Sequence, residues 1–523
     1  MSKEGQRSRP EVIADEEVWV SESGHATRRP ESVGGWHAAR ADWLDIPEAL
    51  ERILAVVRPL EVESVPLLEA AGRVLYEAVT SPIDQPPWDN SAMDGFAVRA
   101  ADVRGATSEA PVELTVVDDV PAGEFPSRPL GPGEAVKIMT GAPVPEGADS
   151  VVRVEHTNAW TGTGRGTVRP GAGRGEREGG ADTGGRTGDP DAGDDRVAAS
   201  APGIGATTGR DATQHSPGAP GTLIRIFSDG DAGRNIRRRG EDLRLGETVL
   251  EAGQVLRPAE IGILAATGHA VVRVHRRPRV AILANGDELV DLDRFDEVVA
   301  GRRIVNSNSY ALAAAVAATG CEPVPLGIAA DDARSLREHL RAALGADALI
   351  TTAGASVGEH DLIKDALDEL GFELDFWRVR MRPGSPFSFG RLEGVPVFGL
   401  AGNPVSALVT FEVMVRPALR RMLGRRVLHT PTLRARAGER IPGARGLTHF
   451  PRARLEVDGD GPPRAWLTGA QGSGILSSVA SADALLVVPE GVEAIEPGQD
   501  IVAIPIPPGD PASSDLGFSV TAT

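Results

Sequence analysis

DALITTAGASVGEHDLIKDAL, residues 347–367, is the stretch that decides the fold. It begins with an apolar run as long as one buried strand and ends with apolar residues at helical spacing. A loop with Gly354 and Gly358 joins the two parts. Strand, glycine loop and helix in this order form the repeating unit of a parallel sheet. We therefore expect an α/β domain whose ligand binds at the carboxyl end of the strand.

The flanking sequence repeats the alternation of strand and helix. Further strands are predicted in RVAILANG (279–286), EPVPLGIAA (322–330), FELDFWRVRM (372–381) and VPVFGLAG (395–402), with helices at 309–318, 333–344, 361–370 and 404–422. This pattern predicts a doubly wound α/β domain over residues 277–424, with helices on both faces of a mostly parallel sheet. Beyond Gly424, short strand-like runs between Pro and Gly turns predict a small all-β domain at 425–508.

The N-terminal half is β-rich, apart from a helix predicted at 46–57 with Asp45 as its N-cap and a second short helix at 67–77. Residues 157–220 are rich in Gly, Asp, Arg and Thr and contain no Leu, so they cannot bury enough apolar surface to offset the entropy of ordering. We predict a disordered insertion there. Strand-like sequence on both sides indicates an expanded hairpin loop within one domain, and a domain boundary is the weaker alternative.

Composition excludes several functional classes. The chain has 523 residues, of which 41% are hydrophobic, enough for several cores. Its 74 acidic and 55 basic side chains give a net charge of -19, which repels nucleic acids and anionic membrane surfaces. The single cysteine, Cys321, excludes a disulfide within one chain and a cysteine-based zinc or iron–sulfur site. The charged N-terminus and the lack of a long apolar run indicate a soluble, cytoplasmic protein.

Two segments of the β-rich half carry candidate groups. In PPWDNSAMDGFAVRAADV (86–103), Asp94 lies among turn residues just before a strand, where Met93 and Phe96 would pin the turn and fix the orientation of Asp94. A tight turn whose side chains bond their own backbone is the open alternative. In VKIMTGAPVPEGADSVV (136–152), Thr140 follows a strand-like run, so its hydroxyl could face a ligand, although a turn after a strand is ordinary.

The segment NIRRRGED (235–242) carries three consecutive arginines. On a strand, Arg237 and Arg239 would share one face and Arg238 would occupy the other, so at least one face is strongly cationic. A solvated charge run is the usual explanation. In a chain with a net charge of -19, the cluster is also a natural place to bind phosphate bidentately.

The glycine loop and two later loops offer further anion-binding groups. Free N–H groups at the start of the helix near Asp361 favour an anion, Ser356 adds a hydroxyl, and Glu359 with Asp361 could hold Mg²⁺ beside a phosphate. The loop is neither a Walker A nor a Rossmann sequence, and plain helix capping is the alternative. In MRPGSPFSFG (381–390), Arg382 ends a strand and could reach the same crevice. In LAGNPVSALVTF (400–411), Asn403 is placed as an N-cap.

Taken together, these segments resemble the molybdopterin molybdenumtransferase family, known in bacteria as MoeA and in animals as the C-terminal part of gephyrin. The matching signatures, in the family's order, are DNSAMDGFAVR, IMTGAPVPEGAD, IRRRGED, the GDEL of ANGDELV, ASVGEHD and GNPVSA. The resemblance runs from about Trp43 to Pro508, interrupted by the Gly-rich insertion. Six signatures in one order are far more specific than any one of them.

The resemblance implies an elongated protomer of four parts, an obligate homodimer, and a cleft that both subunits help to form. The α/β domain would be similar to the molybdopterin-binding fold of the partner adenylyltransferase, MogA. The implied parts are a linker and dimerisation domain (44–82 plus 228–276), a β-rich domain (83–156 plus 221–227), the α/β domain (277–424) and a C-terminal β domain resembling a barrel (425–508), with tails at 1–43 and 509–523.

The resemblance further implies an enzyme that takes adenylylated molybdopterin and molybdate, cleaves the phosphoanhydride with Mg²⁺, and yields molybdenum cofactor and AMP. The adenylyltransferase is the expected upstream partner. By position, the catalytic and metal-binding acids are Asp94, Glu241 and Asp361, with Thr140 as a further catalytic residue. The residues expected to bind substrate are Gly354, Ser356, Gly358, Arg238, Arg239, Arg382, Ser385, Asp287 and Asn403.

Several positions depart from the family pattern. Arg382-Pro383-Gly384 stands where relatives usually have Lys-Pro-Gly, and Ser385 follows where bacterial relatives often have Lys. Other changes fall at Ala353, Asn285 and Ala401. They are compatible with an altered anion preference, a divergent paralogue or reduced activity.

Two other functions stay open. The first is a non-catalytic scaffold, since the animal relative also acts as a structural organiser; retention of Asp94, Glu241 and Asp361 favours an enzyme instead. The second is the adenylyltransferase itself, which needs only the α/β domain. The β-rich segments before Arg279 and after Gly424 argue against it.

Overall fold

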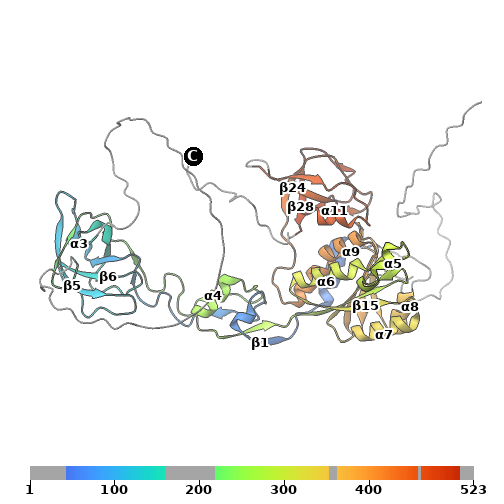
Figure 1. Ribbon diagram of the computed structural model, residues 1–523, viewed down its shortest axis with the longest axis horizontal. Helices are drawn as coiled ribbons and strands as arrows, with labels where there is room; N and C mark the ends of the chain where they lie inside the picture. Colours follow the sequence, from blue (N-terminus) through green and yellow to red (C-terminus); the bar gives the residue numbers. More distant parts are fainter. Residues whose placement is uncertain (1–42, 161–217, 353–361, 458–460, 507–523) are drawn as a thin grey trace, which may run out of the picture. The chain divides into compact units, whose positions relative to one another are not determined.

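The computed structural model describes residues 43–160, 218–352, 362–457 and 461–506, which form two compact units (Figure 1). Unit 1 comprises residues 1–77, 252–261 and 270–523, and unit 2 comprises 78–251 and 262–269. The predicted tails at 1–43 and 509–523 and the predicted disordered insertion at 157–220 lie almost wholly outside the described residues. No helix within the described ranges combines the length and the apolar character needed to cross a bilayer.

Unit 2 is built on a five-stranded sheet. Its strands, in spatial order, are β7 (Ser150–Arg153), β4 (Gly95–Val98), β6 (Glu134–Ile138), β5 (Val112–Val120) and β8 (Leu223–Ile226). Strands β5 and β6 are parallel and the other neighbours are antiparallel. Apolar side chains on one face, including Phe96, Leu114 and Val152, form its core. The short helices α3 (Ala100–Val103) and η2 (Val154–His156) follow β4 and β7.

Strands β7 and β8 flank the long insertion but lie at opposite edges of this sheet, so the expected hairpin between them is wrong. The chain after β7 instead crosses to β8, where Thr157 forms a bridge with Ile226. Two hydrogen bonds also join Asn158 and Arg225. The Asn158 N–H donates to the Arg225 carbonyl at 3.2 Å, and the Arg225 N–H donates to the Asn158 side-chain oxygen at 2.8 Å. The two ends of the insertion are therefore held together by described residues.

Short ribbons complete the N-terminal half. In unit 2, β3 (Asn90–Ser91) pairs with β9 (Ile236–Arg237) and β2 (Val79–Thr80) pairs with β10 (Thr248–Leu250). In unit 1, β1 (Val62–Pro66) pairs with β11 (Val271–His275). Helix α4 spans Pro258–Ala266. The helix predicted at 67–77 is wrong beyond its first turn: η1 covers only Leu67–Ala70, because the chain turns at Gly72 with φ +75°.

The α/β part of unit 1 confirms the predicted doubly wound domain. Its sheet has the order β15 (Glu322–Ala329), β12 (Arg279–Asn285), β16 (Ala348–Thr351), β20 (Val395–Leu400), β19 (Phe387–Leu392) and β17 (Glu373–Trp377). Strand β19 alone runs antiparallel to its neighbours. The sequence prediction missed it, because Ser388 and Gly390 interrupt the apolar run and Pro383 and Gly384 suggest a loop.

Helices cover both faces of this sheet, as Figure 1 shows for α6 and α9 on one side and α7 and α8 on the other. Side-chain alternation along β12 produces the two cores: Val280 and Ile282 pack with α6, whereas Ala281 and Leu283 pack with α7. The helices are α2 (Ile46–Val56), α5 (Phe295–Val299), α6 (Ser307–Thr319), α7 (Ala333–Ala343), α8 (Leu362–Glu369), α9 (Pro404–Thr410) and α10 (Arg416–Met422), with η3 (Leu292–Arg294) and the π-helical turn η4 (Phe411–Val415).

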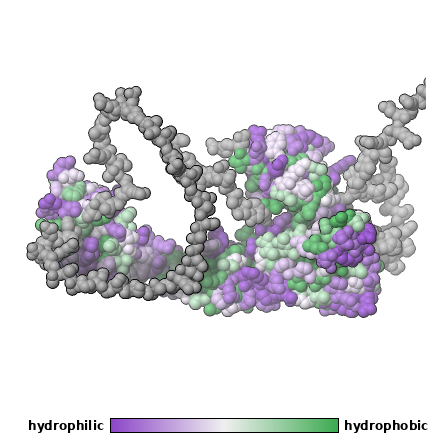
Figure 2. Space-filling model, in the orientation of Figure 1, coloured by the Kyte–Doolittle hydropathy of each residue, from purple (hydrophilic) through white to green (hydrophobic). Residues whose placement is uncertain are grey.

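Most predicted helix limits are confirmed within two residues. The Asp45 side chain caps α2 by accepting from the backbone N–H of Glu48 at 2.8 Å, as predicted. The helix predicted over 404–422 is continuous but contains η4 between α9 and α10. A short pair, β13 (Leu289–Val290) with β14 (Ile304–Val305), brackets α5. On the visible face, hydrophilic surface covers α7 and hydrophobic surface gathers around α5 (Figure 2).

The C-terminal part of unit 1 is a closed five-stranded barrel, which confirms the predicted β domain. Its strands are β21 (Leu433–Ala437), β25 (Arg464–Leu467), β24 (Arg452–Glu456), β26 (Ala484–Val487) and β28 (Asp500–Pro505), with α11 at Leu476–Ala480 and a side pair of β22 (Ile441–Pro442) and β27 (Ala494–Ile495). Alanines fill much of its narrow interior. The pairing of β18 (Met381–Arg382) with β23 (Thr448–His449) ties the barrel to the α/β part.

Candidate functional site

Three candidate segments that are far apart in the sequence lie side by side in unit 2. Strand β3 contacts the turn after β6, because the Ser91 N–H donates to the Ala142 carbonyl at 3.0 Å and the Gly141 N–H donates to the Ser91 carbonyl at 2.8 Å. On its other side, Asn90 of β3 pairs with Arg237 of β9. The fold thus brings together the segments of Asp94, Thr140 and the three arginines.

Asp94 is exposed and has a fixed orientation. Its Oδ1 accepts from the Thr140 backbone N–H at 2.7 Å and from the Thr140 hydroxyl at 2.8 Å. These two hydrogen bonds lower the pKa of Asp94, so the carboxylate is ionised at neutral pH. The next residue, Gly95, lies where a Cβ atom would stand 2.0 Å from the Val152 carbonyl oxygen. Only glycine lets β4 approach β7 closely enough to place Asp94 in this way.

The arginine segment differs from its prediction. Strand β9 ends at Arg237 and Gly240, with φ +67°, turns the chain, so strand alternation does not govern Arg238 and Arg239. Both are instead tied to carboxylates. The Arg238 Nη1 donates to Asp89 at 2.6 Å, while the Arg239 Nε donates to Asp84 at 2.7 Å. Both arginine side chains remain about two-thirds exposed and can reach a ligand.

The two carboxylates position the arginines, and the sequence reading assigned no role to either. Asp89 also accepts from the Arg239 backbone N–H at 2.8 Å. Burial opposes ionisation of Asp89, but the hydrogen bonds from Arg239 N–H and Arg238 outweigh it and lower its pKa. Hydrogen bonds from the Leu245 N–H and the Arg239 side chain likewise lower the pKa of Asp84. The available signal was that Asp89 is the first residue of the DNSAMDG segment and that Asp84 lies shortly before it.

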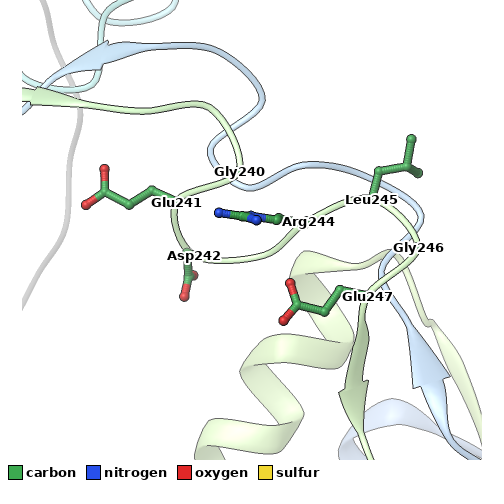
Figure 3. Close-up of a pocket in the computed structure, with 7 residues that line it drawn as sticks. All are labelled: Gly240, Glu241, Asp242, Arg244, Leu245, Gly246 and Glu247. Carbon is green, nitrogen blue, oxygen red and sulfur yellow. The ribbon is translucent and has the colours of Figure 1, made fainter.

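Glu241 lies in an open depression of about 510 Å³ formed by one loop, Gly240–Glu247. Its Oε2 accepts from the Arg238 backbone N–H at 2.7 Å, which closes the turn after β9. Figure 3 shows the side chains of Glu241, Asp242, Arg244 and Glu247 projecting from this loop. Three carboxylates and one guanidinium make the depression acidic, which suits a cation better than a free anion.

A second group of candidates lies at the carboxyl ends of neighbouring strands in the α/β part of unit 1. Asp287, just after β12, is exposed and is joined to Asp331, just after β15: each backbone N–H donates to the other carboxylate at 3.2 Å. Asn285 also donates to Asp331, at 3.1 Å, and Arg303 donates to the Asp287 carbonyl. Asp331 was missed by the sequence analysis, although it follows the strand adjacent to β12.

Asn403 stands at the N-cap position of α9, but its side chain accepts no capping hydrogen bond, so that part of the prediction is wrong. It is exposed. The first turn of α9 is satisfied differently, because the Val405 N–H donates to the Ser473 carbonyl at 3.0 Å. The Gly402 carbonyl accepts from the Asn308 side chain at 2.6 Å. This arrangement leaves the Asn403 amide at the edge where β12, β16 and β20 end.

Arg382 and Ser385 border the junction between the α/β part and the barrel. Arg382 ends β18 with an exposed side chain that has no hydrogen-bond or ion-pair partner among the residues described here. Ser385 is engaged locally, because its hydroxyl donates to the Met381 carbonyl. Between them, Gly384 has φ +97°, and a Cβ there would stand 2.2 Å from the Thr410 hydroxyl. Burial, and then the nearby Arg382 and Arg452, lower the pKa of His449.

The glycine loop itself, with Gly354, Ser356, Gly358 and Asp361, lies outside the described residues. The described residues on either side of it are the buried Thr352, which follows β16, and Leu362, where α8 begins. Among the residues that are described, no group of three or more His, Cys, Asp or Glu side chains is arranged to hold a metal ion.

Comparison with known proteins extends over nearly the whole described chain. Residues 44–196 and 206–268 match the MoeA N-terminal region (domain I and II), residues 281–421 match the probable molybdopterin binding domain, and residues 434–506 match the MoeA C-terminal region (domain IV). Molybdopterin molybdenumtransferase 2 of Mycobacterium tuberculosis is 35% identical over 463 residues, which cover 86% of this chain and 97% of that protein. The chain belongs to the molybdopterin molybdenumtransferase family.

Other members of the molybdopterin molybdenumtransferase family give the same result. The Bacillus subtilis protein of that name is 31% identical over 459 residues, which cover 88% of this chain and 93% of the relative. Among solved structures, the molybdopterin biosynthesis moeA protein from Pyrococcus horikoshii OT3 matches with a TM-score of 0.66 and 29% identity, covering 88% of this chain and 100% of that one. The similarity therefore includes both units.

Proposed function

We propose that this protein inserts molybdate into adenylylated molybdopterin, releasing AMP and forming molybdenum cofactor in the cytoplasm. One structural observation carries the proposal: three separate family signatures meet in unit 2, where they gather an ionised Asp94, Thr140, Glu241 and exposed arginines. Family membership over almost the full length supports the same conclusion. A non-catalytic scaffold would not require an ionised carboxylate in a fixed orientation.

The residue types suit cleavage of a phosphoanhydride. Such cleavage separates two phosphates, so negative charge must be neutralised and the nucleophile must be guided in line. Arg238 and Arg239, held by Asp89 and Asp84, are proposed to contact the phosphates, and Arg382 to contact phosphate or molybdate. Asp287, Asn403, Ser385, Gly354, Ser356 and Gly358 are proposed to complete the substrate site, and Asp361 to join Asp94 and Glu241 as a third acid.

Mg²⁺ fits the donors present in unit 2. Thr140 occupies one oxygen of Asp94 and the Arg238 N–H occupies one of Glu241, so each carboxylate keeps a second oxygen without a partner among the described residues. Mg²⁺ commonly binds one or two carboxylates together with substrate phosphates and water. When bound, it would supply positive charge to the phosphate oxygens. The protein residues would orient it, and the hydrogen bonds from Thr140 keep the Asp94 carboxylate ionised.

A homodimer is the proposed assembly. Leu68 of η1 is 82% exposed and Val271 of β11 is 59% exposed. The Leu67 N–H donates to the Ala270 carbonyl at 3.0 Å, so these two exposed side chains lie on adjoining segments. A second copy would remove this apolar surface from water. The upstream adenylyltransferase is proposed as a further partner, for which the exposed Leu292, Phe295 and Val299 around α5 offer a contact surface.

The test is to incubate the purified protein with adenylylated molybdopterin, molybdate and Mg²⁺ and to measure AMP. We expect release that depends on molybdate and is lost in Asp94→Asn. The matched control is Glu109→Gln, which removes an exposed carboxylate elsewhere in unit 2 and should release AMP like the parent. AMP release that is equal with and without molybdate would contradict the proposed function.

A further inference from the structure

Two large aromatic side chains in unit 2 are exposed and contact each other. Trp88 is 37% exposed and Phe125 is 63% exposed. Their ring centroids lie 4.8 Å apart with an interplanar angle of 66°, an edge-to-face pair. Neither ring belongs to a hydrophobic core of the unit. Both therefore present apolar faces to water, which is unfavourable unless another group covers them.

The backbone places this pair beside the site already described. Trp88 directly precedes Asp89, the residue that holds Arg238, and the Asp89 carbonyl accepts from the Val144 N–H at 2.9 Å. Phe125 lies on the loop that leaves β5 after Val120. The Val120 carbonyl accepts from the Met139 N–H at 3.2 Å, and Met139 is followed by Thr140. Both aromatic loops thus adjoin the turn that orients Asp94.

The neighbouring positions on these loops are also exposed and apolar. Met93, next to Asp94, is about two-fifths exposed, and so is Met139, next to Thr140. Methionine adapts its shape to a flat ring and makes favourable sulfur–aromatic contacts. The Arg238 side chain, which donates to Asp89 next to Trp88, is 63% exposed. Flat apolar faces next to a cation match a planar ring that carries a phosphate.

We propose that Trp88 and Phe125 form a stacking surface for a planar heteroaromatic ring of the substrate, with the attached phosphate directed to Arg238. This inference rests on the proposed function, in which the substrate carries two such rings, an adenine and a pterin. Stacking tolerates either ring, because each has a π face, and the phosphate contact would fix which way the ring enters. The two sources are separated by experiment.

Binding to the full-length protein is measured by calorimetry with three probes: AMP, 6-hydroxymethylpterin, and ribose 5-phosphate as a phosphate without a ring. Trp88→Ala and Phe125→Ala should each raise the Kd of one ring-bearing probe about tenfold, the size expected for loss of one stacking contact. Trp88→Phe keeps a ring and should change that Kd less than threefold. Ribose 5-phosphate should bind all variants alike.

The control is Trp160→Ala, which removes another exposed tryptophan of unit 2 and should leave every Kd unchanged. A shift confined to AMP assigns the surface to adenine, and a shift confined to the pterin assigns it to the pterin. Unchanged affinity for both rings in folded Trp88→Ala and Phe125→Ala overturns the inference. Molybdate-dependent AMP release is measured in parallel: if it persists in the parent while no ring affinity changes, the inference fails and the proposed function stands.

Discussion

The bond between Thr140 and Asp94 gives the sharpest prediction, because a single hydroxyl can be removed without a change of shape. Thr140→Val keeps the branched side chain and the backbone N–H bond of 2.7 Å to Asp94 but deletes the hydroxyl bond of 2.8 Å. A hydrogen bond to a charged group contributes about 1.5–3 kcal/mol, and exposure to solvent places this one near the lower limit. A loss of that size corresponds to about a tenfold fall in kcat/KM.

The pH dependence separates this role from a merely structural one. Hydrogen bonds from Thr140 lower the pKa of Asp94, so removing one of them raises that pKa. The ionised form is then lost at a higher pH as the solution is acidified, and the acid limb of the kcat/KM profile should move to higher pH. The assay is molybdate-dependent AMP release across pH. Thr140→Ser, which keeps a hydroxyl, should restore the parent profile.

A Thr140→Val variant with the parent's kcat/KM and an unshifted acid limb would refute this reasoning. A uniform loss of activity at every pH, not restored by serine, would instead indicate that Thr140 packs the turn and does not tune Asp94. Far-UV circular dichroism of both variants shows whether the fold is kept.

Four further predictions concern the fold and the site. Gly95→Ala should destabilise the protein by about 3 kcal/mol in urea unfolding, because its Cβ would stand 2.0 Å from the Val152 carbonyl, whereas Gly262→Ala, with open space around the new Cβ, should cost nothing. Deletion of 161–217 should leave folding, dimerisation and AMP release intact, since Thr157–Ile226 and Asn158–Arg225 already join its ends; loss of the dimer in gel filtration would contradict this. Asp347→Asn should cost about 2 kcal/mol at pH 7, because Asp347 accepts two bonds of 2.8 Å from Arg276 and one of 2.7 Å from the Arg279 N–H. Burial opposes the ionisation of Asp347, but these bonds outweigh it and lower its pKa. The parent should therefore exceed Asp347→Asn in unfolding free energy by the full amount above the unfolded-state pKa of this carboxyl. That difference should vanish as the pH falls through the folded-state pKa. Arg382→Ala should raise KM for molybdate or the adenylylated substrate, and unchanged affinity and turnover would remove Arg382 from the site.

The α/β domain was predictable because its signal is local. Buried strands such as β12 and β16 are continuous apolar runs, and the helix predicted over 309–318 corresponds to α6, which ends at the left-handed Gly320, φ +101°. Strand β19 was missed, since its serine and glycine face a packed interior that local sequence does not reveal. The helix expected over 67–77 was lost to a turn at Gly72, where tertiary pairing of β1 with β11 overrides helix propensity.

The candidate site was predictable in its members but not in its contacts. Sequence order placed Asp94, Thr140 and Glu241 as candidates, yet the bond between Asp94 and Thr140 joins residues 46 apart and depends on how β4 and β6 pair. The roles of Asp84 and Asp89 as holders of Arg239 and Arg238 also required long-range structure, over separations of 155 and 149 residues. Asp331 escaped attention because a single acid after a strand carries no distinctive pattern.

The central claim is the proposed function, in which Asp94 and Asp361 serve the same step of AMP release. Single-turnover AMP release from Asp94→Asn, Asp361→Asn and the double variant tests it most directly. Residues that serve one reaction step are strongly non-additive, so we expect the double variant to be no slower than the slower single variant. If the two losses multiply instead, Asp94 and Asp361 act independently, which would contradict this claim.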